Sequence, residues 1–201
     1  MKVLHLRGPI PLFTNTFILL DEHGSAAVID PAAKAGQYLD ILEKEGAKLT
    51  HILLTHGHFD HVGAVQELKQ ATGAKVFAGE GEARGTQLHP LTPEQVDEFY
   101  RDEQTIPVGQ AAVKVFYTPG HSQGCVCLLC GDVMFTGDTL FAGDIGRTDL
   151  ETSNPDSMRK SLARLCRTIE DDVQVLPGHN DFSTMGRERA QNPYLQEFVN
   201  A

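Results

Sequence analysis

The alternation of apolar and polar positions along the chain predicts nine short strands, and wider apolar spacing predicts four helices. Apolar and β-branched runs predict strands at residues 3–6, 16–20, 26–29, 51–54, 75–78, 112–117, 125–129, 133–136 and 173–176. Apolar residues three or four positions apart predict helices at 34–46, 62–72, 154–169 and 187–199, the last interrupted at Pro193. Gly46 is expected to end the first helix, since glycine is common just past helix C-termini.

The order of these elements is typical of an α/β protein. Two similar halves that face each other would make a four-layer αββα sandwich, although the spacing alone does not establish a second sheet. Residues 79–104 are polar and weakly patterned, with a helical turn expected at Pro93. A long segment of this kind is often functional, for example as a lid over a binding site. The length of 201 residues predicts one domain spanning residues 1–201.

Composition narrows the possible environments and partners. The formal net charge of −10 argues against sequence-independent binding of nucleic acid. No stretch approaches the roughly 18 continuous apolar residues that span a membrane, and the N-terminus is too polar for a signal peptide. We therefore expect a cytoplasmic protein with no membrane partner. The four cysteines lack the spacing of a structural zinc site and are expected to be small buried residues.

The densest group of polar side chains lies between a predicted strand and a predicted helix. Residues 55–61 read Thr-His-Gly-His-Phe-Asp-His, directly after the strand at 51–54. Ligands and catalytic groups collect at such strand ends in α/β proteins. Imidazole and carboxylate groups crowded at one corner suit a divalent cation such as zinc, iron or manganese.

Three later strand ends repeat this arrangement with one candidate ligand each. They read Pro-Gly-His121, Thr-Gly-Asp138 and Pro-Gly-His179, and the glycine permits a tight turn toward a shared point. One zinc ion with an open position needs only three protein ligands, so the full set fits two metals that share a bridging carboxylate. The seven candidate ligands are His56, His58, Asp60, His61, His121, Asp138 and His179.

The other four histidines lack this setting. His5, His23, His51 and His89 do not follow a strand end within a cluster of candidate ligands. We expect them to be surface residues or satisfied core residues rather than ligands.

These motifs resemble those of the metallo-β-lactamase superfamily. The resemblance covers essentially the whole chain, because His-x-His-x-Asp-His at 56–61 and the three later corners occur in the family's order. It implies the αββα sandwich, with two metals at one edge between the sheets and Asp138 bridging them. It also implies two ligand sets, His56, His58 and His121 for the first metal and Asp60, His61 and His179 for the second.

Within this superfamily the sequence is similar to the glyoxalase II-like branch, the hydroxyacylglutathione hydrolases and their relatives. The similarity is carried by residues 118–125, 135–141 and 146–150, the last reading Gly-Arg-Thr-Asp-Leu. Full-length glyoxalase II has a C-terminal helical extension that contributes to glutathione binding, and this sequence has no counterpart. The chain therefore resembles the shorter, single-domain hydrolases of the branch.

The resemblance implies a dinuclear metal-dependent hydrolase that cleaves a thioester, with an S-hydroxyacyl thiol as its small-molecule substrate. Zinc is the expected metal, and iron or manganese are alternatives. A hydroxide that bridges the metals would attack the acyl carbon, because zinc lowers the pKa of bound water to about 7. Asp60 is the expected catalytic residue, since it would orient this hydroxide and accept its proton.

Three other functions remain open at this point. A persulfide dioxygenase of the same fold would bind one iron through His56, His121 and Asp138. A lactonase would use the same metals on a different substrate, and a non-catalytic binding protein could keep the fold alone. True β-lactamases fit less well, because those of the best-known type have cysteine at the position of Asp138.

Two residues outside the ligand set are candidates for substrate contacts. Asn15 precedes a predicted strand and is expected on a loop beside the metals, although a turn residue is the simpler interpretation. Arg147 follows the bridging aspartate by nine residues and would lie in or behind the pocket. Its alternative role is a salt bridge within the loop, with Asp149 as the nearby acid.

Overall fold

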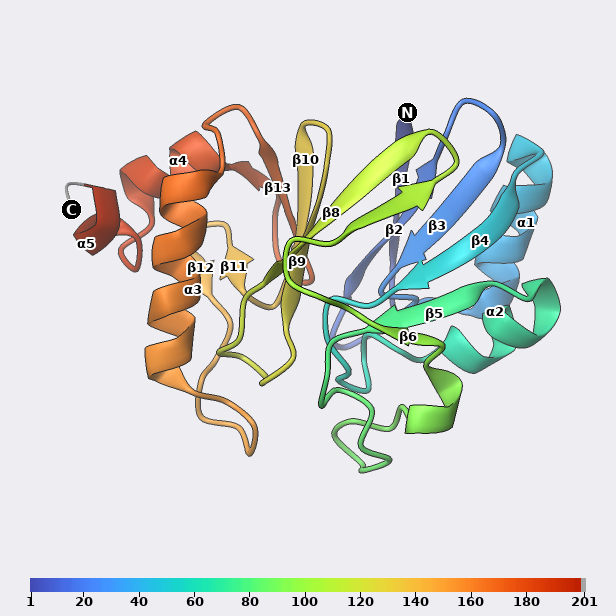
Figure 1. Ribbon diagram of the computed structural model, residues 1–201, viewed down its shortest axis with the longest axis horizontal. Coiled ribbons are helices and arrows are strands. Elements are labelled where there is room, and N and C mark those ends of the chain that lie inside the picture. The colour runs from blue at the N-terminus through green and yellow to red at the C-terminus, as the bar shows by residue number, and fades with distance from the viewer. Residues whose placement is uncertain (200–201) are drawn as a thin grey trace.

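Two six-stranded sheets face each other and carry helices on their outer faces (Figure 1). The computed structural model describes residues 1–199. The first sheet has the order β1 (Lys2–Arg7), β2 (Asn15–Leu20), β3 (Ser25–Ile29), β4 (Lys48–Leu53), β5 (Lys75–Ala78) and β6 (Glu98–Phe99). The second has the order β14 (Ser183–Thr184), β13 (Gln174–Pro177), β10 (Val133–Gly137), β9 (Val126–Cys130), β8 (Ala111–Tyr117) and β7 (Thr105–Val108). A separate hairpin consists of β11 (Leu140–Phe141) and β12 (Asp144–Ile145).

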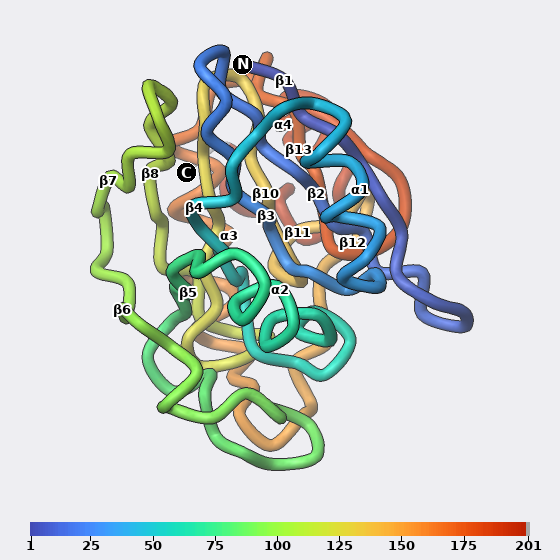
Figure 2. The backbone as a smooth tube through the Cα atoms, turned by 90° about the vertical axis from the view of Figure 1, so that its right-hand side faces the viewer, coloured from blue at the N-terminus to red at the C-terminus, as the bar shows by residue number. Residues whose placement is uncertain are grey.

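The helices complete the outer layers. Helices α1 (Ala35–Glu45) and α2 (Val65–Thr72) cover the first sheet, and Figure 2 shows them in front of its strands. On the second sheet lie α3 (Pro155–Thr168), α4 (Met185–Gln191) and α5 (Gln196–Val199). This arrangement confirms the predicted α/β class and the four-layer αββα sandwich. Within residues 1–199, no helix combines the length and the apolar character needed to cross a membrane.

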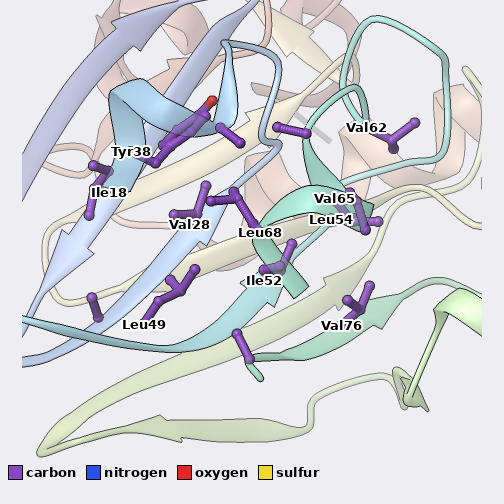
Figure 3. Close-up of a cluster of buried hydrophobic side chains, with 14 of the residues drawn as sticks. Ile18, Val28, Tyr38, Leu49, Ile52, Leu54, Val62, Val65, Leu68 and Val76 are labelled. Carbon is purple, nitrogen blue, oxygen red and sulfur yellow. The ribbon is translucent and has the colours of Figure 1, made fainter. Parts of the chain in front are cut away.

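Side chains on alternate positions of each strand fill three separate cores. In β2, Ile18 and Leu20 point toward α1 and α2, while Phe17 and Leu19 point into the space between the sheets. Figure 3 shows the first of these cores, where Ile18 gathers with side chains from the neighbouring strands and helices. The period of two follows from strand geometry, in which successive side chains point to opposite faces. A third core lies between the second sheet and α3, α4 and α5.

Most helix boundaries agree with the sequence pattern. Gly46 ends α1 in the left-handed conformation with φ 62°, as expected. Helix α3 begins where the Asn154 side chain accepts a hydrogen bond from the Ser157 backbone N–H. The predicted interruption at Pro193 is confirmed by the gap between α4 and α5, and a 3₁₀ turn occupies Pro93–Gln95.

The sequence pattern missed several short strands. Strand β7 was not predicted because Pro107 interrupts its apolar run, and it occupies the edge of the second sheet, where proline is tolerated. Strands β6, β11, β12 and β14 contain two residues each, too few for any periodicity to appear. Apart from the 3₁₀ turn and β6, residues 79–104 are irregular, as the sequence predicted.

Four strands end at the same edge of the sandwich, and this edge carries the candidate ligands. Strand β4 precedes the cluster at 56–61, and β8 leads to the loop with His121. The adjacent strands β10 and β13 run parallel, so Asp138 and His179 emerge side by side at their carboxyl ends. The polar corners, separated in sequence, therefore meet in space.

Replacing Tyr38 by phenylalanine tests the packing of α1 on the first sheet. The buried hydroxyl accepts a hydrogen bond from the Ala33 N–H at 2.9 Å and lies 2.7 Å from Thr16 Oγ1. Because the Ala33 N–H would lose its partner, we expect the free energy of unfolding to fall by about 1–3 kcal/mol. Urea denaturation should show a lower midpoint at an unchanged slope. Tyr194→Phe, in an exposed ring, is the control, and equal midpoints for the two variants would contradict the expectation.

Candidate metal centre

The candidate ligands gather in two neighbouring groups at the edge between the sheets. The ligand atoms of His56, His58 and His121 lie within 4.8 Å of one another. A second group with the same spacing consists of Asp60, His61 and His179. These are the two sets that the sequence resemblance implied, and the structure brings the members of each together.

In the first set, hydrogen bonds orient the imidazole rings. His56 Nδ1 lies 3.1 Å from Thr55 Oγ1, and His121 Nδ1 donates to the Arg147 backbone oxygen at 2.9 Å. Each of these contacts leaves the opposite nitrogen, Nε2, directed toward the centre. His58 has the other orientation, because its Nδ1 lies 2.9 Å from His121 Nε2.

The second set is held in the same way. His61 Nδ1 lies 3.0 Å from Asp30 Oδ2, and His179 Nδ1 donates to the Leu12 backbone oxygen at 3.2 Å. Asp60 Oδ2 accepts a hydrogen bond from Thr14 Oγ1 at 2.9 Å and lies 3.2 Å from His179 Nε2. These contacts with Thr14, Asp30 and Leu12 hold Asp60 and the two rings in place. The atoms that could bind a metal therefore face a common point.

Asp138 lies between the two sets. Its Oδ1 is 3.4 Å from His61 Nε2, and its Oδ2 is 3.5 Å from His121 Nε2 and 3.6 Å from His179 Nε2. Gly178 allows this close approach, since a Cβ there would lie 2.5 Å from Asp138 Oδ1. The carboxylate can therefore serve both sets, as a bridging ligand must.

Several nitrogen and oxygen atoms in the cluster have no hydrogen-bond partner in the protein. Their chemistry tests whether the residues fit a metal. Within residues 1–199, the buried atoms without a hydrogen-bond partner include His56 Nε2, His61 Nε2 and Asp138 Oδ1. Buried polar atoms are nearly always paired in native proteins, so several unpaired ones together indicate a binding site for an ion. Imidazole nitrogen and carboxylate oxygen are the ligands of zinc and iron sites. The cluster fits a divalent metal site.

The two sets differ in their electrostatics. Burial lowers the pKa of His58 to about 3 and places that of His56 well below its usual value, and neighbouring histidines add to both shifts. Both rings are therefore neutral, the form that binds metals. Burial also opposes the charged form of His61, but Asp138 and Asp30 outweigh it and raise its pKa to about 9. This excess of negative charge favours a cation in the second set.

Asp30 is a site residue that the sequence interpretation missed. Its Oδ1 accepts from the Thr55 N–H at 2.7 Å, and its Oδ2 from Thr55 Oγ1 at 2.5 Å and from His61. It adopts φ 48° just after β3, so it turns back beneath the ligand loop. The carboxylate is already engaged and acts from behind His61. An aspartate directly after a strand was the signal available, without the glycine that precedes Asp138.

The two predicted substrate contacts lie at different depths. Asn15 is buried, and its amide donates to the backbone oxygens of Pro177 and Asn180, both at 3.0 Å. It supports the loop that presents His179. Arg147 is exposed and forms a two-point ion pair with Asp149, the loop salt bridge considered as its alternative role. Substrate contact by either residue stays a prediction.

Two sets of exposed side chains flank the ligands. On one side, a recess is lined by Phe59, which stands between His58 and Asp60 in the ligand loop, and by Thr86, Gln87, Leu88 and Glu151. On the other, a recess reaches His179 and is lined in part by Leu12 and Phe13. Figure 2 shows the loop between β1 and β2, which carries Leu12 and Phe13, projecting from the body of the molecule.

His89 departs from its predicted setting. It was expected at the surface or in a satisfied core position, but its buried ring lies 4.5 Å from that of His58. Among the described residues, its Nε2 is one of the buried atoms without a hydrogen-bond partner. His89 does not belong to either ligand set.

Comparisons with known proteins agree with this geometry. The sequence model described as "Metallo-beta-lactamase superfamily" matches residues 9–179. Hydroxyacylglutathione hydrolase GloC from Haemophilus influenzae is 32% identical over 204 residues, which cover 93% of this chain and 95% of that protein.

Solved structures show the same likeness. ETHE1 from Myxococcus xanthus has a TM-score of 0.85 at 29% identity, covering 100% of this chain and 89% of that chain. The protein TTHA1623 in a di-iron-bound form has a TM-score of 0.81 at 32% identity, covering 96% and 100%. The chain belongs to the metallo-β-lactamase superfamily, whose fold and metal-binding cluster it carries.

Proposed function

We propose that the protein is a dinuclear metal-dependent hydrolase that cleaves a small S-hydroxyacyl thioester. The observation that carries this proposal is the position of Asp138, within 3.6 Å of histidines from both ligand sets. A mononuclear centre held by His56, His121 and Asp138 would leave His61, His179 and Asp60 without a role as ligands. The likeness to GloC from Haemophilus influenzae, named a hydroxyacylglutathione hydrolase, supports the choice of substrate class.

Zinc is the proposed metal, with iron or manganese as alternatives. The di-iron form of TTHA1623 supports a two-metal site in a similar chain and keeps iron in consideration. When bound, the metals would lower the pKa of a water molecule and stabilise the negative charge that develops on the acyl oxygen.

The chain's own residues orient the reaction. Asp60 keeps one oxygen on Thr14 and His179, so its carboxylate is fixed beside the space between the sets. From there it can accept a proton from the attacking water. The departing thiolate is a good leaving group and needs little help from an acid.

The flanking recesses offer room for the two ends of the substrate. Phe59 and Leu88 supply an apolar wall on one side, and Leu12 and Phe13 supply another beside His179. A thioester centred on the metals would extend its acyl group and its thiol carrier along these walls.

A persulfide dioxygenase is the second candidate. It would use one iron held by His56, His121 and Asp138. His121 Nε2 lies 3.5 Å from Asp138 Oδ2, and the ligand atoms of His56 and His121 lie within 4.8 Å of each other. A lactonase would keep both metals and differ only in its preferred substrate.

Metal content and assay conditions separate these functions. Protein purified without added metal should contain two metal equivalents per chain and hydrolyse S-lactoylglutathione equally well with and without oxygen. A lactone panel run in parallel is expected to give lower kcat/KM values. One iron per chain, with oxygen consumed in the presence of glutathione persulfide, would replace the hydrolase by the dioxygenase.

Asp60→Asn should reduce kcat by about 100-fold or more, because the amide cannot accept the proton. Metal content should fall toward one equivalent, since Asp60 also belongs to the second set. The matched control is Asp132→Asn in the exposed turn between β9 and β10, at the opposite edge. Full activity in Asp60→Asn would remove this residue from the mechanism.

Removing the metals should lower the melting temperature. A metal present at about 100 times its Kd contributes about 2.7 kcal/mol, and for a domain of this size that corresponds to about 5–10 °C. Differential scanning calorimetry before and after dialysis against a chelator measures the shift, and added zinc should reverse it. An unchanged melting curve after verified metal loss would contradict a contribution of the metals to stability.

A further inference from the structure

We propose that Glu82 is a positioning residue that holds the three ligands of the first metal in place. Glu82 belongs to the irregular segment 79–104 and is fully buried, with a relative exposure of 0%. Its Oε1 accepts hydrogen bonds from Ser122 Oγ and from the Gly124 N–H, both at 2.7 Å. Its Oε2 accepts one from the Gly57 N–H at 2.8 Å.

The positions of these donors connect Glu82 to the metal. Gly57 lies between His56 and His58, and Ser122 directly follows His121. One carboxylate therefore joins the two loops that carry the whole first set. Hydrogen bonds to an ionised carboxylate are short and strong, so this contact fixes the separation of the loops.

Close packing makes the connection stiff. A Cβ at Gly57 would lie 2.3 Å from the Glu82 backbone oxygen, and one at Gly124 would lie 2.9 Å from Glu82 Oε1. No side chain can therefore stand between Glu82 and either loop. A displacement of the carboxylate would move the backbone beside the ligands directly.

His89 completes the surroundings of this carboxylate. Its Nε2 lies 3.5 Å from Glu82 Oε2, and its ring packs on that of His58. Burying a carboxylate is costly unless its oxygens are satisfied, and here each oxygen has a protein donor. Segment 79–104 thus reaches the first set through both Glu82 and His89.

The second set is held by different residues. Asp30 contacts His61, and Thr14 contacts Asp60. Asp30 also accepts from Thr55 Oγ1, which contacts His56, so it reaches both sets. Glu82 contacts only the loops of the first set, which predicts that this set can be weakened separately.

The inference rests on the proposed two-metal function, and Glu82→Gln tests it. The amide nitrogen of glutamine is a donor and would face the backbone N–H of Gly57 or of Gly124, each of which also donates. Loss of an outer contact of this kind typically lowers metal affinity by about 10–100-fold. We expect this loss for one metal equivalent in a competitive Co²⁺ titration, while the affinity for the other equivalent stays at its wild-type value.

Proton NMR of the Co²⁺-loaded protein identifies the weakened set. The shifted ring N–H signals of His56, His58 and His121 should disappear from Glu82→Gln at limiting Co²⁺, while those of His61 and His179 remain. Asp30→Asn should instead weaken signals from both sets, because Asp30 contacts His61 and, through Thr55, His56. Glu80→Gln, at the exposed position two residues away, is the matched control and should behave as wild type.

A milder variant keeps the test decisive if Glu82→Gln fails to fold. Ser122→Ala preserves the carboxylate and removes one of its three donors, so its effect on the first metal should be smaller but equally selective. Equal weakening of both metals, or no change in either, would overturn the inference. A wild-type chain that binds one Co²⁺ would overturn the two-metal function instead, and the effect of Glu82→Gln on that single affinity would still be measured.

Discussion

The structure depends on one electrostatic constraint: nitrogen and oxygen atoms buried at the sheet edge require a positive charge between them. Within residues 1–199, His56 Nε2, His61 Nε2 and Asp138 Oδ1 have no hydrogen-bond partner. A buried polar atom left in this state costs about 1–3 kcal/mol, so an apolar filling of the space is excluded. The neutral rings of the first set and the carboxylate-rich second set both favour a divalent cation. The four strand ends supply these atoms, and the three cores behind them supply the rigidity.

Around the ligands, a layer of supporting groups divides into two parts. Asp30 and Thr14 contact the second set from the first sheet and the loop that follows β1. Glu82 contacts the loops of the first set from a segment with almost no regular structure. Because metal ligands must be held within fractions of an ångström, such supports matter as much as the ligands themselves. An irregular segment can provide one only when, as with Glu82, its side chain is buried and fully hydrogen-bonded.

The sequence predicted candidate site residues where the pattern that marks them lies within a few neighbouring residues. Candidate ligands such as His121 and His179 directly follow an apolar strand and a glycine, a pattern visible within five residues. Asp30 also follows an apolar strand directly, but it lacks the preceding glycine, and the sequence interpretation did not include it. Glu82 has no local signal, because its partners lie 25 to 42 residues away and become neighbours only in the folded chain. Strand β7 was missed for a different reason. Pro107 weakens the local strand pattern, but the segment still forms a strand because it pairs with β8.

The same distinction separates the chemistry of the site from its choice of substrate. The ligands follow the ends of paired strands, whose positions are fixed by the sheets and by the cores on both faces. The walls of the two recesses are exposed loop side chains, including Phe59 on one side and Phe13 on the other. Changes in these loops would alter what reaches the metals without disturbing how the metals are held. Proteins of one fold can therefore keep the same metal centre and differ in substrate.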